Sequence, residues 1–115
     1  MPIPLIIWAA AAAGAGYIAY KNRVKIAAYF ESAEGKNLLN SLNKAAAGAM
    51  KPYQDICEKC LAMHTTERKE FLRDLKQNRM SDTSWSMLVS YAKELPKRDV
   101  TYLAVAVDMN VINEE

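Results

Sequence analysis

The hydrophobic and polar positions divide the chain into an uncharged N-terminal stretch and a longer part in which apolar residues recur at helical spacing. No charged side chain occurs in the first twenty residues, and Lys21, Arg23 and Lys25 follow directly. As a helix, the stretch from Ile3 to Tyr20 would be roughly 27 Å long, close to the bilayer hydrocarbon thickness of about 30 Å. The pattern therefore predicts a single transmembrane helix, continuing into the rest of the chain.

The residues that flank this stretch predict its depth and direction in the membrane. Aromatic residues lie near both of its ends, as is typical of side chains at the two lipid–water interfaces. Basic residues follow only the C-terminal end, which predicts that the rest of the chain is cytoplasmic. We expect an anchor with a basic flank at residues 1–23 and a helical domain at residues 24–115. The side chains expected at lipid headgroups are Trp8, Tyr17, Tyr20, Lys21, Arg23 and Lys25.

Two other interpretations of the N-terminal stretch remain open. Ala13-Gly14-Ala15 resembles the cleavage site of a secretory signal peptide, but the basic residues that normally precede such a signal are missing. Alanine is also an excellent helix former in water, so residues 3–20 would suit a buried helix of a soluble protein. An interfacial helix is disfavoured because the stretch has no polar face.

Small residues recur four positions apart in the same stretch. Such spacing stacks them on one face of a helix, so that two helix backbones can approach closely in a membrane. It predicts self-association through the anchor, although an alanine-rich segment meets this pattern easily by chance. The expected contact face comprises Ala9, Ala10, Ala12, Ala13, Gly14 and Gly16.

Beyond the anchor, the pattern predicts an all-α fold, a small bundle of about four to five helices. The anchor helix should continue to about Glu34, with Gly35 as its left-handed C-terminal residue. Pro52 should end the next helix, and Ser81 is one of several residues able to cap a later one. The helices expected after the anchor cover residues 37–50, 53–63, 65–78, 81–95 and 100–110.

The last of these segments suits two kinds of structure. Val100, Leu103, Ala104 and Val107 recur at helical spacing, and Asp99 could cap such a helix. Valine, threonine and tyrosine dominate the composition of the segment, however, and these residues equally favour a strand. A helix is the better prediction because no second convincing strand is found to pair with it.

Cys57, Cys60 and His64 form the clearest candidate for chemistry. A C-x-x-C pair can supply half of a tetrahedral zinc site or form a redox disulfide, and His64 follows one turn later. A zinc site would lack a fourth Cys or His, and no thioredoxin-like pattern surrounds the pair. Two cysteines on an apolar helical face are more often reduced packing residues. We therefore expect packing, and neither a metal nor another cofactor.

The charge pattern argues against nucleic acid as a partner. The 15 basic residues are interspersed with 13 acidic ones, and the net charge is only +2. In the densest basic cluster, Glu67, Glu70 and Asp74 occur at helical pairing distances from the basic residues, which is typical of a solvated face with ion pairs. The cluster comprises Arg68, Lys69, Arg73, Lys76 and Arg79.

These observations predict a membrane-anchored, non-enzymatic protein that mediates interactions or forms oligomers. No phosphate-binding loop or paired-carboxylate motif points to a reaction. The expected partners are the lipid bilayer, further copies of the chain and an unidentified protein. An oligomeric pore-forming or membrane-disrupting effector is the second hypothesis. A soluble helical regulator or enzyme is the third, and it requires residues 3–20 to form a core helix.

Overall fold

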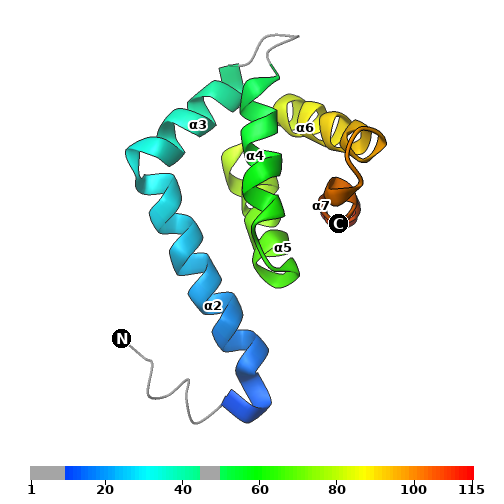
Figure 1. Ribbon diagram of the computed structural model, residues 1–115. Coiled ribbons are helices and arrows are strands. Elements are labelled where there is room, and N and C mark those ends of the chain that lie inside the picture. The colour runs from blue at the N-terminus through cyan, green and yellow to red at the C-terminus, as the bar shows by residue number, and fades with distance from the viewer. Residues whose placement is uncertain (1–9, 45–49) are drawn as a thin grey trace.

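The computed structural model describes residues 10–44 and 50–115, and the side chains among them from Lys21 onward. Within these residues the chain forms six α-helices and no strand, so the all-α prediction is confirmed (Figure 1). The helices are α2 (Ala10–Glu31), α3 (Ala33–Lys44), α4 (Lys51–Leu61), α5 (Thr65–Asp74), α6 (Asp82–Glu94) and α7 (Leu103–Asn113). A π-helical turn, η1 (Leu75–Arg79), follows α5, and two 3-10 turns, η2 (Leu95–Lys97) and η3 (Val100–Tyr102), precede α7.

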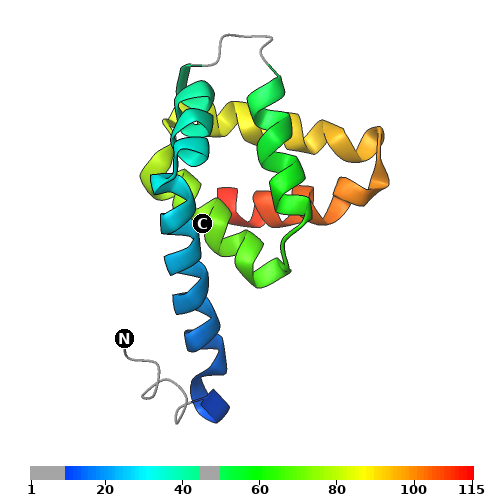
Figure 2. The same cartoon turned by 60° about the vertical axis from the view of Figure 1, so that its left-hand side comes forward.

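Helix α5 packs against both α2 and α7 and so connects these two helices. Helices α6 and α7 run in opposite directions, one above the other, and α4 crosses beside them (Figure 2). The N-terminal half of α2 extends away from the other helices, on the side of α7 that is remote from α6 (Figures 1 and 2). The fold is therefore a small bundle with one projecting helix.

The hydrophobic core draws residues from every helix of the bundle, including the C-terminal half of α2. Ile26 and Phe30 of α2 are buried, and the ring of Phe30 stacks on Phe71 of α5 with centroids 5.4 Å apart. Burying a large apolar side chain contributes about 1.5–3 kcal/mol, so these residues tie α2 firmly to the bundle. The boundary expected between residues 23 and 24 lies inside α2, which has no break there.

The corner between α2 and α3 differs from the prediction. Helix α2 ends at Glu31, and the chain bends at Ser32, whose hydroxyl accepts a hydrogen bond from the Gly35 backbone N–H at 3.1 Å. Gly35 is therefore no helix terminator, because it lies in the first turn of α3. A Cβ added there would overlap the carbonyl oxygen of Tyr29, so the residue is glycine because the α2 backbone passes so close.

Two other helix boundaries have clear causes. Pro52 lies in the first turn of α4, where a missing N–H costs least, so it begins a helix instead of ending one. Of the several residues that could cap α6, Ser81 does so, because its hydroxyl accepts a hydrogen bond from the Ser84 N–H at 3.1 Å. The last segment is helical, and the strand alternative is wrong. Asp99 caps η3 at its start by accepting from the Thr101 N–H at 3.0 Å.

No helix within residues 10–44 and 50–115 is long and apolar enough to cross a bilayer. The predicted span begins at Ile3, so its first part lies outside the described residues. Helix α2 includes the rest of the predicted span, from Ala10 to Tyr20, and continues through Lys21 without a break.

Candidate functional site

The basic residues after Tyr20 lie along the part of α2 that approaches the bundle. Lys21, Arg23 and Lys25 are all exposed, and the Lys25 ammonium lies 2.8 Å from the Glu67 carboxylate of α5. Two of the three predicted headgroup lysines and arginines thus face solvent, while Lys25 also binds the bundle. The predicted Trp8 and Ala9 lie outside the described residues. Tyr17, Tyr20 and the small residues Ala10, Ala12, Ala13, Gly14 and Gly16 belong to α2, but their side chains lie outside the description.

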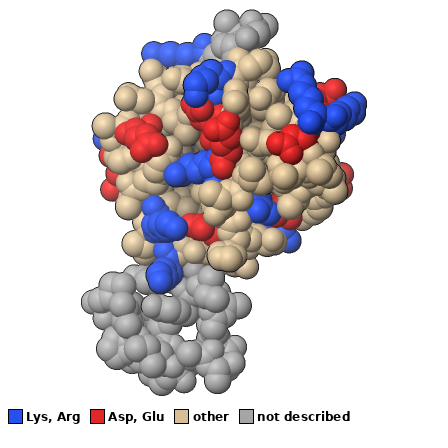
Figure 3. Space-filling view, viewed as in Figure 1, with Lys and Arg blue, Asp and Glu red and all other residues tan. Residues whose placement is uncertain are grey.

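A groove of about 990 Å³ separates α2 and α3 from α4. Tyr29 of α2 and Leu38 of α3 line one wall, Asp55 of α4 lines the other, and Phe71 of α5 lies at the bottom. Figure 3 shows acidic and basic side chains interspersed over this face of the molecule. The groove combines an apolar floor with a charged rim, which is typical of a surface that binds another molecule.

The charged groups on the rim of the groove are held by neighbours. The Lys59 ammonium lies 3.9 Å from the centre of the Tyr29 ring, a cation–π contact that joins α4 to α2. Lys51 binds Asp55 at 2.6 Å, and Glu58 accepts a hydrogen bond from a neighbouring glutamine. Burial raises the pKa of Tyr29, so its hydroxyl keeps its proton at neutral pH. The rim is therefore polar, with charged groups of both signs held in contacts with their neighbours.

The two cysteines are packing residues in this structure. Cys57 and Cys60 are free thiols on the inner face of α4 and have no exposed surface. Burial raises the pKa of Cys57 to about 12 and raises that of Cys60 as well, so both thiols stay protonated and poorly reactive. His64 is exposed beyond the end of α4. Among the described residues, no group of three or more His, Cys, Asp or Glu side chains could hold a metal ion.

A buried ion pair joins α7 to the centre of the bundle. Arg68 of α5 donates to Asp108 of α7 at 2.6 Å, and both residues are buried. The same guanidinium donates to the backbone carbonyl oxygens of Cys60 at 2.9 Å and Met63 at 2.8 Å, at the end of α4. Arg68 was expected on a solvated face, and that expectation is wrong because its partner is distant in sequence.

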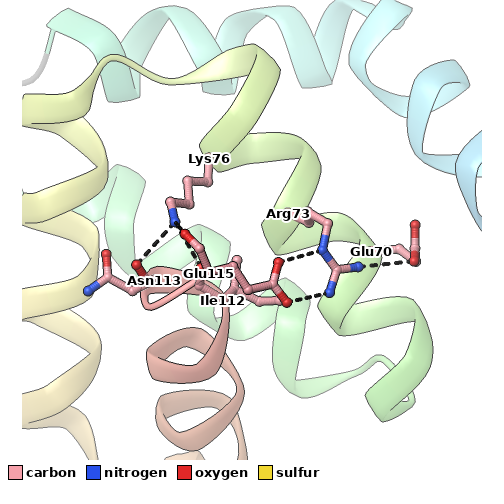
Figure 4. Close-up of polar contacts among 6 residues, drawn as sticks. All are labelled: Glu70, Arg73, Lys76, Ile112, Asn113 and Glu115. Atoms are coloured by element: carbon pink, nitrogen blue, oxygen red, sulfur yellow. Dashed lines mark hydrogen bonds and ion pairs between the residues drawn. The ribbon is translucent and has the colours of Figure 1, made fainter.

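The end of α7 is held by two further residues of α5 and η1 (Figure 4). Arg73 donates two hydrogen bonds to the Glu115 carboxylate, both at 2.7 Å, and a third to Glu70 at 3.1 Å. The Lys76 ammonium donates to three backbone carbonyl oxygens at the end of α7, each at 3.0 Å. A lysine in this position satisfies carbonyls that a helix end leaves without partners. Helix α7 is therefore fixed along its length.

The outer face of α7, defined by Val100, Leu103, Val107 and Val111, is apolar and exposed. The exposed fractions of these residues are 72%, 52%, 52% and 45%, in that order. Val100, Leu103 and Val107 are the residues whose helical spacing predicts a helix here, and in the structure they are exposed together with Ala104. The inner face carries Val105, Asp108, Met109 and Ile112. Both faces are apolar, so periodicity alone did not distinguish them, and the pairing of Asp108 with Arg68 selects the inner one.

Comparison with models of known protein families, with curated proteins and with solved structures finds no match. The groove and the outer face of α7 are therefore identified as candidate sites from the structure alone. Sequence reasoning missed the groove because its walls come from four helices, and no local pattern brings them together. Helical spacing pointed to Val100, Leu103 and Val107, but not to Val111 and not to the exposure of this face.

Proposed function

We propose that the protein is a membrane-anchored, non-enzymatic interaction module whose helical domain lies on the cytoplasmic side of the bilayer. The observation that carries this proposal is the continuity of α2, which is helical from Ala10 to Glu31. Its N-terminal half belongs to the predicted span, and its C-terminal half is buried in the bundle through Ile26 and Phe30. The same helix thus acts as anchor and as part of the domain.

The groove between α2, α3 and α4 is the proposed binding surface for a partner protein. Its volume of about 990 Å³ is at the upper end of the range of about 300–1,000 Å³ typical of small-molecule sites, and it is open to solvent along the charged rim. Charged residues of both signs at a rim give specificity for a partner with the complementary arrangement. A protein segment that carries both acidic and basic side chains fits these properties.

Membrane insertion is tested with two substitutions at one position near the middle of the predicted span. Ala12→Arg should release the protein from membranes, because an arginine at the centre of a span costs about 2.5–3.5 kcal/mol on insertion scales. Ala12→Leu is the matched control and should retain the native distribution. The measurement is carbonate extraction followed by flotation of the full chain. Recovery of the native chain in the soluble fraction would contradict the anchor.

The groove is tested by photo-crosslinking in intact cells. A photoreactive residue at Ser41, which lines the groove, should give a discrete adduct, and one at the exposed Lys93 of α6 should not. Glu58→Lys should abolish the Ser41 adduct because it reverses a charge on the rim. Equal adduct patterns from the two positions would contradict the groove as the binding surface.

Self-association through the span is tested separately. Gly14→Leu with Gly16→Leu should weaken oligomers, because bulky side chains keep two helix backbones apart. Insertion should be unchanged or stronger, since leucine is favourable in lipid. Chemical crosslinking in membranes measures the first effect and flotation the second. An unchanged ladder of oligomers would place the contact outside the small-residue face.

A further inference from the structure

Of the two antiparallel helices, α7 lies nearer than α6 to the projecting half of α2 (Figures 1 and 2). Helix α6 covers the side of α7 that faces away from the projecting half of α2, and α4 and α5 cover another side of α7 (Figures 1 and 2). The axis of α7 lies across the direction of α2 (Figure 2). If α2 crosses a bilayer, α7 is therefore oriented along the membrane plane, with an uncovered apolar face toward the lipid.

Two ion pairs connect α7 to α2 through α5. Lys25 of α2 binds Glu67 of α5 at 2.8 Å, and the next residue, Arg68, binds Asp108 of α7 at 2.6 Å. Figure 2 shows α7 at the height of the C-terminal half of α2, the half that contains Lys25. Lys25 is about 7.5 Å along the helix from Tyr20, the last residue of the predicted span. The headgroup layer on each side of a bilayer is about 5–8 Å thick, so α7 lies at the level of the headgroups.

We propose that the outer face of α7 rests on the lipid bilayer and forms a second membrane contact beside the span. This inference rests on the proposed anchor in α2. The outer face comprises Val100, Leu103, Ala104, Val107 and Val111, all uncharged and exposed, and the exposed Glu114 continues the same stripe one turn after Val111. An apolar helix face in the plane of the interface enters the boundary between headgroups and acyl chains.

Basic residues near the same level complement an anionic lipid surface. Lys21 and Arg23 are exposed on α2 within the two turns below Lys25. Arg98 is also exposed, just before η3, where the equally exposed Asp99 separates it from the outer face. Each basic residue near an anionic membrane gains about 1 kcal/mol, and the gain decays within a Debye length. The contact thus combines apolar burial with attraction to acidic phospholipid.

The size of the outer face favours a bilayer over a second protein surface. Residues 100–111 span about 17 Å of helix, and a helix is about 10 Å wide, so the face covers about 170 Å². Stable protein–protein interfaces bury about 800 Å² on each partner. The outer face alone is too small for such an interface. A bilayer, in contrast, needs no surface of complementary shape, and the proposed span already holds the domain beside the bilayer.

The depth of α7 is measured by spin labelling of the full chain in vesicles of phosphatidylcholine and phosphatidylserine. A nitroxide at Val107→Cys reports on the outer face, and one at Lys93→Cys on α6 is the matched control. The native Cys57 and Cys60 are buried, and the unsubstituted chain carried through the same labelling provides the blank. Collisions with oxygen increase inside a bilayer, and collisions with a water-soluble nickel chelate increase outside it. We expect oxygen to dominate at residue 107 and nickel at residue 93.

The outcomes separate this inference from the anchor. Loss of the oxygen preference at residue 107 on adding Leu103→Asp would support the inference further. Dominance of nickel at residue 107 in a chain that floats with the vesicles would overturn the bilayer contact and leave the anchor standing. Spin–spin broadening between copies at residue 107 would also overturn it, because the face would then be covered by a second copy. A chain that does not float would overturn the anchor and, with it, the contact.

Discussion

Arg68→Met should be among the most destabilising single changes in the helical domain. Methionine preserves most of the volume but removes the three hydrogen bonds that Arg68 donates to Asp108 and to the carbonyls of Cys60 and Met63. Asp108 would then be a buried carboxylate without its cation. Removing one member of a buried pair costs about 3–5 kcal/mol, a large part of the 5–15 kcal/mol that stabilises a typical domain.

Two comparisons isolate the cause of this loss. Arg73→Met changes the same residue type one and a half turns later, but Arg73 and its partner Glu115 are each about one-third exposed, so a far smaller loss is expected. The double variant Arg68→Met with Asp108→Leu removes both charges, and it should be more stable than Arg68→Met alone. The difference between the double variant and the sum of the single variants gives the coupling energy of the pair.

Urea unfolding of the full chain in mild detergent, followed by circular dichroism, measures these free energies. The reasoning predicts a lower midpoint for Arg68→Met with an unchanged slope. A loss below about 1 kcal/mol would refute it, since a surface ion pair contributes no more than that. Equal losses for the Arg68 and Arg73 variants would refute it as well, because burial would then make no difference.

Three further predictions concern the packing of the bundle. Gly35→Ala should destabilise the corner between α2 and α3, because the added Cβ would overlap backbone atoms of α2. Lys36→Ala should not, and thermal melting of the two variants measures the difference. Cys57 and Cys60 should resist alkylation until the chain unfolds. Burial raises the pKa of Cys57 in the folded chain from 9.0 to about 12, so the free energy of unfolding should fall as the pH rises from 9 to 12. The fall should be smaller in Cys57→Ala, and urea titration at each pH measures it. Ser81→Ala should cost about 1 kcal/mol of unfolding free energy, and Ser81→Asp should restore most of it.

The helices were predictable where the sequence contains local signals. Ser81 marks the start of α6, and Pro96 follows its end, so both boundaries agree with the structure to within two residues. The apolar helical face expected around the two cysteines is the inner face of α4, where Tyr53, Ile56, Cys57 and Cys60 are buried. In each case the decisive interaction lies within a few positions along the chain, where periodicity and capping rules apply.

The features that were missed depend on residues far apart in sequence. Arg68 and Asp108 are 40 positions apart, and only their pairing shows which face of α7 is buried. Gly35 suggested a helix end, because its real constraint, the close passage of the Tyr29 backbone, arises only once α2 and α3 fold against each other. The groove has the same origin, since its walls belong to separate helices. Local patterns contain no information about such contacts.

The unbroken course of α2 also sets the rotational phase between the two halves of that helix. An α-helix turns by about 100° and rises by about 1.5 Å with each residue. One alanine inserted after Tyr20 would therefore swing the bundle by about 100° around the axis of α2 and lift it by only about 1.5 Å. Seven inserted residues would nearly restore the direction and lift the bundle by about 10 Å. The number of residues between Tyr20 and Ile26 thus determines both the direction and the distance of the bundle relative to the N-terminal half of α2.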